Sequence, residues 1–274
     1  MKTLQRRYLS LVLLAVVMVY GVVNAYTLQV KEVTIPVFGL SKPIRAVHLT
    51  DIHLGNFRGK KYLEKVVDKT ISLKPDVVFN TGDLFDSKAH FYTGTDVLDP
   101  FKKIEVPHYF VDGNHDEYVG ADQVFELTRK AGLINLQNKL GNYGELQLVG
   151  LNNMAQDSIS FDLHTPPGSK TIKDVLDKLL IDKNKPTLVM HHRPVGEKYM
   201  QKKGIDVLLA GHTHAGQMFP FTLIARALFP YLKGLYHYQD MSIYVSQGQG
   251  TIFVPFRIGT VSEITVVNLV PKND

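Results

Sequence analysis

Short apolar segments alternate with longer amphipathic segments through most of the chain. The apolar segments have the length of buried strands, and they occupy Ile44–Leu49, Asp76–Phe79, His108–Val111, Thr187–Met190 and Ile205–Ala210. Between them, residues 60–74, 121–133 and 171–180 show helical periodicity. In the first of these, one helix face is formed by Leu63, Val66, Val67, Thr70 and Ile71. This alternation predicts an α/β domain whose strands are largely parallel.

Two regions depart from this pattern. Residues 144–153 alternate like a strand but have no helical partner, and residues 242–270 are rich in strand formers and punctuated by glycine. We expect a second sheet, packed against the first, that contains both regions. A leading strand is expected within residues 26–43. Because no repeat or linker interrupts the chain, residues 27–274 are expected to form one domain.

The N-terminal segment 1–26 has the pattern of a membrane-targeting sequence. Basic side chains precede Tyr8–Ala25, which contains no charged residue and is near the lower limit of about 17–25 residues for spanning a bilayer. A cleaved signal peptide has the same pattern, with Val23–Ala25 as its cleavage site, but we favour a retained signal-anchor. Either way the basic end stays in the cytoplasm. We therefore expect a domain at the cell membrane on its extracytoplasmic side.

Composition limits the functions and the metal ligands that the chain can have. The chain has 274 residues, of which 45% are hydrophobic, and this is ordinary for a folded protein. Its formal net charge of +5 includes three basic residues at the N-terminus, and there is no long Lys/Arg stripe, so nucleic-acid binding has no support. The absence of cysteine excludes disulfides and thiolate metal sites. Any metal ion must be held by histidine, carboxylate or amide side chains.

Polar side chains follow each of the five apolar segments at once. In chain order they are Asp51 and His53; Asp83; Asn114, His115 and Asp116; His191 and His192; and His212 and His214. The carboxyl ends of parallel strands lie along one edge of a sheet, and ligands bind there in such folds. We therefore expect these residues to meet in space, although they are spread over most of the chain.

The donor set favours two metal ions. Three or four imidazoles, two carboxylates and an amide oxygen are more donors than one tetrahedral ion uses. Mixed nitrogen and oxygen donors suit Mn, Zn or Fe. Two such ions about 3.5–4 Å apart can hold both the attacking and the leaving oxygen of a phosphoryl transfer.

The sequence resembles the calcineurin-like metallophosphoesterase superfamily. The similarity lies in "DIH", "GD", "GNHD", "HRP" and "GHTH", which run in this order from Asp51 to His214. The N-terminal segment, "GHTHAGQ" and "VSQGQGT" are similar to a membrane-anchored cell-envelope branch found in bacteria. The resemblance implies a four-layer α/β sandwich with two mixed sheets between helices.

The resemblance also implies a role for each residue of these motifs. Asp51, His53 and His214 would hold the first ion, Asn114, His192 and His212 the second, and Asp83 would bridge both. His115 would face the substrate phosphate, with Asp116 beside it. His191 is an alternative to His192. Neighbouring strand residues point to opposite faces, so one of the two is expected to reach the metals, and the spacing before Pro194 favours His192.

We expect a phosphohydrolase, with phosphodiesters favoured over monoesters. A hydroxide bridging the two ions would attack phosphorus, and His115 would protonate the leaving oxygen or stabilise the phosphoryl charge. One alternative is a pyrophosphatase acting on a nucleotide-linked lipid precursor, and another is a decayed metal-binding module. The substrate would be a small phosphorylated molecule or a lipid-linked phosphate.

The segment Phe219–Tyr238 is rich in aliphatic and aromatic residues. It either packs over the sheet edge or forms an apolar lip beside the metals at the membrane interface.

Overall fold

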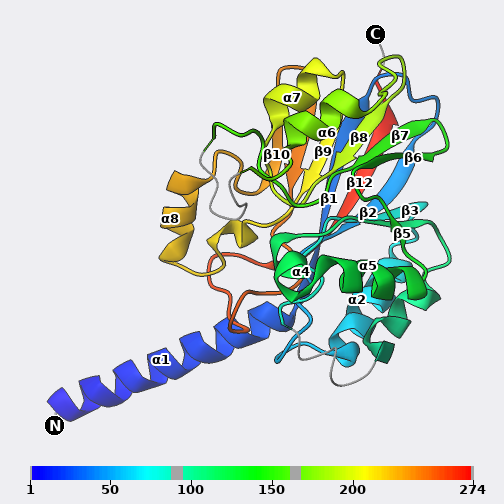
Figure 1. The fold of residues 1–274 in the computed structure, drawn as a ribbon. Coiled ribbons are helices and arrows are strands. Elements are labelled where there is room, and N and C mark those ends of the chain that lie inside the picture. The colour runs from blue at the N-terminus through cyan, green and yellow to red at the C-terminus, as the bar shows by residue number, and fades with distance from the viewer. Residues whose placement is uncertain (1, 88–94, 161–167, 273–274) are drawn as a thin grey trace.

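The computed structural model describes residues 2–87, 95–160 and 168–272, which contain two six-stranded sheets (Figure 1). The order in the first sheet is β1 (Leu28–Val37), β12 (Ser262–Pro271), β2 (Ile44–Leu49), β3 (Val77–Asn80), β4 (His108–Phe110) and β5 (Ile134–Asn135). The order in the second is β10 (Gly234–Tyr238), β11 (Met241–Val245), β9 (Val207–Ala210), β8 (Thr187–Met190), β7 (Leu146–Gly150) and β6 (Lys139–Tyr143).

Both sheets are mixed. In the first sheet β2, β3, β4 and β5 are parallel, while β12 is antiparallel to β2 and parallel to β1. In the second sheet β7, β8, β9 and β11 are parallel, while β6 and β10 are antiparallel to their neighbours. The carboxyl ends of the parallel strands therefore gather at one edge of each sheet.

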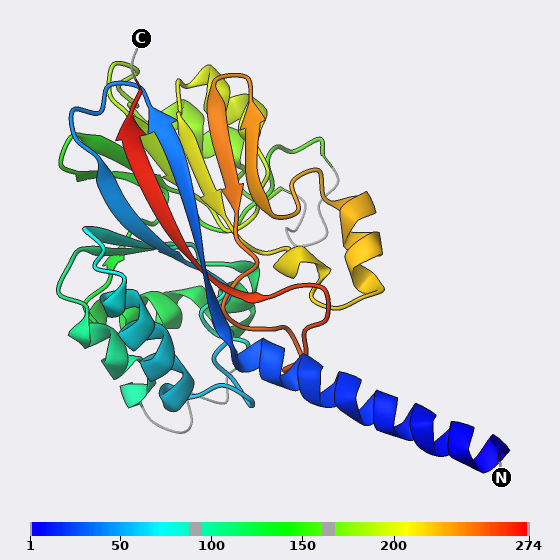
Figure 2. The same cartoon turned by 180° about the vertical axis from the view of Figure 1, so that it is seen from behind.

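Helices cover the outer face of each sheet (Figures 1 and 2). The first sheet carries α2 (Lys60–Ser72), η1 (Thr95–Lys103) and α5 (Ala121–Lys130), and the second carries α6 (Ile172–Lys178) and α7 (Glu197–Lys202). The other helices are α4 (Asn114–Val119), which follows β4, and η2 (His214–Gly216) and α8 (Phe221–Leu228), which follow β9.

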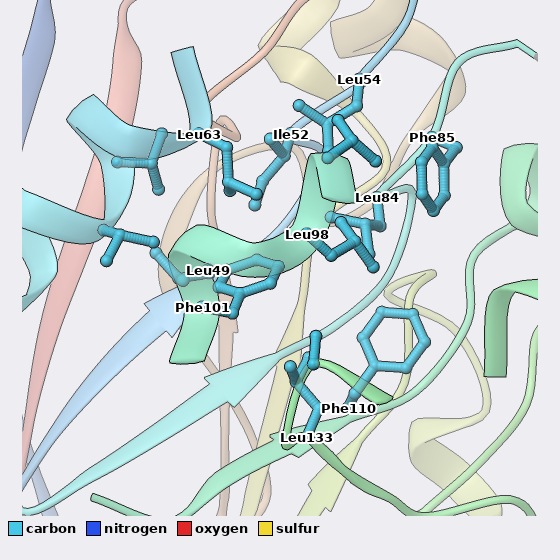
Figure 3. Close-up of a cluster of buried hydrophobic side chains, with 14 of the residues drawn as sticks. Leu49, Ile52, Leu54, Leu63, Leu84, Phe85, Leu98, Phe101, Phe110 and Leu133 are labelled. Atoms are coloured by element: carbon cyan, nitrogen blue, oxygen red, sulfur yellow. The ribbon is translucent and has the colours of Figure 1, made fainter. Parts of the chain in front are cut away.

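Buried apolar side chains hold the four layers together. Figure 3 shows the cluster between the first sheet and its helices, which includes Leu49 of β2, Phe110 of β4 and Leu63 of α2. A second cluster, which includes Phe79, fills the space between the sheets, and a third lies under α6 and α7. Full burial of such side chains contributes about 1.5–3 kcal/mol each. The expected four-layer α/β sandwich is confirmed.

One expected sheet assignment is right for only part of its region. The C-terminal strand region was expected in the second sheet, and β11 does lie there, but β12 lies in the first sheet, between β1 and β2. Its two faces are both buried, because Ile264 and Val266 pack under the helices while Val267 and Leu269 pack between the sheets. A strand that is apolar on both faces fits the interior of either sheet, so its sequence does not determine which sheet it joins.

The buried face of α2 also differs from the expected one. Ile71 is 41% exposed, whereas Tyr62 is buried. The face is rotated toward Tyr62, whose hydroxyl donates a 2.5 Å hydrogen bond to the backbone oxygen of Gln249 in the interior.

The N-terminal helix α1 (Lys2–Tyr26) projects from the domain (Figures 1 and 2). By length and composition, residues Gln5–Tyr26 could cross a bilayer. The last turns of α1 are docked. Asn24 Nδ2 donates to the backbone oxygens of Arg257 (3.1 Å) and Thr260 (2.8 Å), and the Arg257 N–H donates to the oxygen of Gly21 (3.0 Å).

Candidate metal centre

The expected site residues lie at strand ends that belong to both sheets. The loops after β2 and β3 of the first sheet carry Asp51, His53 and Asp83, and Asn114 begins α4 after β4. In the second sheet the loops after β8 and β9 carry His192 and His212, and His214 begins η2. The expectation of one sheet edge is therefore wrong in detail. The two sheets pack face to face, so the carboxyl ends of their parallel strands converge on the same space.

Asp51, His53 and His214 form one group of donors. His214 Nε2 lies 3.2 Å from Asp51 Oδ1 and 3.0 Å from His53 Nε2. All three side chains are buried. Two imidazole nitrogens and a carboxylate oxygen therefore face one point, which is the arrangement that a divalent cation requires.

Asp83, His192 and His212 form a second group. His192 Nε2 lies 3.1 Å from Asp83 Oδ2, and the same Asp83 oxygen lies 3.7 Å from His53 Nε2 in the first group. Asp83 Oδ1 accepts a 2.8 Å hydrogen bond from the backbone N–H of His115. This bond holds the carboxylate with Oδ2 between the two groups.

Asn114 supplies a further oxygen. Its side chain is buried, and its Oδ1 has no hydrogen-bond partner among the residues that the structure describes. A buried carbonyl oxygen without a partner is unfavourable unless an ion or water pairs with it. The orphaned oxygen and the two imidazole–carboxylate groups together fit two divalent cations.

The structure places His192, not His191, beside Asp83. His192 Nδ1 lies 2.8 Å from the backbone oxygen of Thr81, so Nδ1 carries a proton and Nε2 is the ring nitrogen that faces Asp83 and the centre. His191 Nδ1 instead lies 2.7 Å from the backbone oxygen of Arg193.

The site backbone is strained. Asp51, His53, Asp83, His212 and His214 all have positive φ, between 47° and 73°. A non-glycine residue in this region costs about 1–3 kcal/mol, and such residues cluster at functional sites. Five of the seven expected ligands share this feature, so the backbone that directs these side chains toward the centre lowers the stability of the fold.

Hydrogen bonds and close packing hold this backbone in place. The Asp51 N–H donates to Gly82 O (2.8 Å), and the Asp51 carboxylate accepts the His212 N–H at 3.0–3.1 Å. A β-carbon at Gly113 would collide with Asp83 Oδ1, and one at Gly211 would collide with Asp51 Oδ2. The glycines of "GNHD" and "GHTH" therefore let separate loops touch at the carboxylates.

Protonation differs among the histidines. Burial alone would lower the pKa of His53, but hydrogen bonds to Asp51 and Asp86 and the charge of Asp83 raise it to about 9. Burial likewise opposes protonation of His192, whose pKa the charge of Asp83 raises to about 9. Burial lowers the pKa of His214 to about 4. The carboxylates thus hold protons on His53 and His192, which cations would have to displace.

His115 and Asp116 have different surroundings. His115 is partly exposed, and its Nδ1 lies 3.4 Å from Asp86 Oδ1. The Asp116 carboxylate is buried and accepts the N–H groups of Leu84, Phe85 and Gly113 at 3.0–3.2 Å. This geometry supports the loop that carries Asp83 and does not favour contact between Asp116 and a substrate.

Asp86 lies beside two histidines of the site. Its Oδ1 lies 3.4 Å from both His53 Nδ1 and His115 Nδ1. Asp86 therefore connects a proposed metal ligand with the histidine expected to face the substrate.

Arg257 was missed by the sequence analysis. It is fully buried, and its Nη2 lies 3.2 Å from His214 Nδ1 and donates to the backbone oxygens of Gln247 and Gly250 (2.7 Å each). Its backbone N–H bonds to Gly21 of α1. Arg257 thus joins the docked end of α1 to the metal centre. A lone arginine in a loop gives no sequence signal, although the neighbouring "VSQGQGT" was noted.

Comparison with known proteins agrees with this geometry. A model of the family described as calcineurin-like phosphoesterase matches residues 44–216. The chain belongs to this family. The prediction of a metallophosphoesterase is therefore confirmed at the level of the family, and so is the resemblance on which it rested.

Several curated relatives are similar over most of this chain. An uncharacterized metallophosphoesterase of Helicobacter pylori is 31% identical over 89% of this chain. The transmembrane protein with metallophosphoesterase domain of Danio rerio is 32% identical over 95%. This chain spans 65% and 62%, respectively, of those two proteins' lengths. Phosphodiesterase YaeI of Escherichia coli is 28% identical, with 83% of each chain covered.

Solved structures show the same fold. A dimetal phosphatase from Danio rerio matches with a TM-score of 0.51 and 12% identity over 75% of this chain and 87% of that chain. TT1561 of Thermus thermophilus matches with a TM-score of 0.52 and 12% identity over 76% and 91%. At this identity the likeness is one of fold.

Metal affinity is expected to rise with pH. Between pH 6.5 and 8.5 the apparent affinity for Mn²⁺ increases by up to about tenfold per pH unit for each displaced proton, because His53 and His192 are protonated below about pH 9. Titration calorimetry in buffers of different ionisation enthalpy measures the protons released. His192→Asn lowers that number, while His237→Asn on β10 leaves it unchanged. An affinity independent of pH over this range would contradict the assignment.

Proposed function

We propose that the protein is a dimetal phosphodiesterase that works at the cell envelope. The observation that carries this proposal is the position of Asp83, whose Oδ2 lies between the Asp51–His53–His214 group and the imidazole of His192. Two divalent ions of the Mn, Zn or Fe type fit these donors. When bound, such ions supply Lewis acidity toward the phosphoryl oxygens and an activated water as nucleophile.

The side chains of the site divide into proposed metal ligands and groups that orient a ring or transfer a proton. Asp51, His53 and His214 would hold one ion, and Asn114, His192 and His212 would hold the other. His115 Nδ1 faces Asp86, which leaves Nε2 on the opposite side of the ring to donate a proton to the leaving oxygen. Asp86 fixes the ring for this transfer.

Phosphodiester hydrolysis is favoured over the alternatives. The E. coli relative is named a phosphodiesterase, and it is similar over most of its length. Six of the seven expected ligands lie in two groups of facing donors, and Asn114 presents an oxygen without a partner among the described residues, which counts against a decayed metal-binding module. An extracytoplasmic site counts against a nucleotide-linked precursor, because such precursors are made in the cytoplasm.

The envelope location rests on α1. The relatives named as transmembrane proteins and the apolar helix indicate membrane association. Asn24 and Gly21 bond to the backbone of Arg257, and the Ser262 hydroxyl donates to the Ala25 oxygen (2.9 Å). Cleavage after Ala25 would remove several of these contacts, so we propose that α1 is retained as the anchor.

The activity itself is tested with the purified full chain loaded with Mn, Zn or Fe. We expect hydrolysis of an aryl phosphodiester faster than of the matching monoester. Asp83→Asn lowers the rate by more than about 100-fold, beyond the 10–100-fold typical of an outer-sphere change, because both ions lose a shared ligand. Asp68→Asn, an equally conservative change at an exposed position of α2, keeps the rate. No metal-dependent activity on either ester would refute the proposal.

His115→Ala separates the acid role from charge stabilisation. A general acid contributes about 10²–10⁴-fold, and it matters most when the leaving group is a poor one. We therefore expect a loss of that size on an alkyl phosphodiester and a much smaller loss on a 4-nitrophenyl ester, measured as kcat. His237→Ala serves as the control. Equal losses on the two esters would exclude the acid role.

Topology is tested by fusing reporters after Asp274. Because the basic residues precede the apolar helix, a reporter active outside the cytoplasm is expected to work and a cytoplasmic one to be silent. Intact mass of the membrane-extracted protein should include residues 1–26. A reporter active only in the cytoplasm would contradict the proposed location.

A further inference from the structure

An apolar cavity opens beside the metal centre. Its volume is about 470 Å³, and His212 and His214 are part of its lining. Helix α8 contributes Phe221 and Leu228, and the loop of residues 252–254 contributes a second wall. The cavity thus leads from apolar walls to two of the proposed metal ligands.

These walls expose apolar side chains to an unusual degree. Leu228 is 69% exposed, Phe253 79% and Ile224 54%. A contiguous exposed apolar surface of this kind marks a ligand or membrane site. Residues 217–238 contain no acidic side chain, and their charged residues are Arg226 and Lys233. The surroundings of the cavity therefore suit an apolar chain attached to an anionic head.

The cavity lies on the side of the molecule from which α1 projects. Figures 1 and 2 both show α8 and α1 on the same side of the sheets. The loop of residues 252–254 runs directly into Phe256, whose ring packs against Gly21 of α1, and into Arg257, which bonds to Gly21. If α1 spans the bilayer, this wall of the cavity lies at the membrane surface.

We propose that this cavity binds an acyl chain of the substrate, so that the substrate is a phosphodiester lipid taken from the bilayer. The proposal rests on the proposed phosphodiesterase function and names its substrate class. The acyl chain lies between α8 and the loop of residues 252–254, and its phosphate reaches the centre at His212 and His214. The walls offer aliphatic and aromatic contacts with few polar groups, as a hydrocarbon chain requires.

Direct binding and kinetics test this with the full chain in nanodiscs. The probes are ethyl, butyl and octyl phosphate for binding, and the 4-nitrophenyl diesters of the same alcohols for kcat/KM. Each methylene that is fully buried can contribute up to roughly fourfold. We expect octyl phosphate to bind at least about tenfold more tightly than ethyl phosphate, and the octyl diester to show a similar advantage in kcat/KM.

Variants on each wall should abolish this chain-length dependence. Leu228→Asp and Phe253→Ser are both at exposed positions, so folding is preserved, and they lower the octyl-to-ethyl ratio toward one. Leu223→Asp is the matched control, because Leu223 is 60% exposed on the same helix but does not line the cavity. It keeps the wild-type ratio.

The outcomes separate the two proposals. If octyl phosphate binds no better than ethyl phosphate, the acyl site is refuted even when the diesters are hydrolysed. If Leu223→Asp lowers the ratio as much as Leu228→Asp, the chain contacts the general surface of α8 and the cavity assignment is wrong. Chain-length-dependent binding without hydrolysis of any diester would support the acyl site and refute the phosphodiesterase.

Discussion

The arrangement of the Asp83 carboxylate is the constraint on which the rest of the site depends. One oxygen accepts a hydrogen bond from the backbone N–H of His115. The other lies 3.1 Å from His192 Nε2 and 3.7 Å from His53 Nε2. Donors from the first sheet and from the second meet at this side chain. The two sheets must pack face to face with their carboxyl ends aligned for the contact to form. The buried cluster between the sheets, which includes Phe79, is therefore also what positions the metal centre.

This geometry forms although it strains the backbone of several proposed ligands. Asp83 and four other proposed ligands have positive φ, which is unfavourable for residues with a β-carbon. Backbone hydrogen bonds between loops, and glycines that let those loops touch, hold these conformations. Arg257 extends the same network to Gly21 of α1. Helix α1 and the centre are thus parts of one hydrogen-bonded structure.

Much of this could be predicted from sequence, because the signals are local. Strands β2 and β8 have the expected bounds, and polar residues directly after buried strands indicated which side chains would meet. The sheet membership of β12 could not be predicted, since Val266 and Val267 face opposite buried layers. Positive φ at His212, the role of Arg257 and the surroundings of Asp116 depend on contacts between distant segments. Local sequence does not encode such contacts.

The most direct test of the account is a crystal structure of the Mn-loaded protein with anomalous diffraction at the metal edge. The account predicts two peaks about 3.5–4 Å apart with Asp83 coordinating both. It also predicts His53 and His214 at one ion and Asn114 and His192 at the other. A single peak, or an Asp83 carboxylate that points away from both ions, would contradict it.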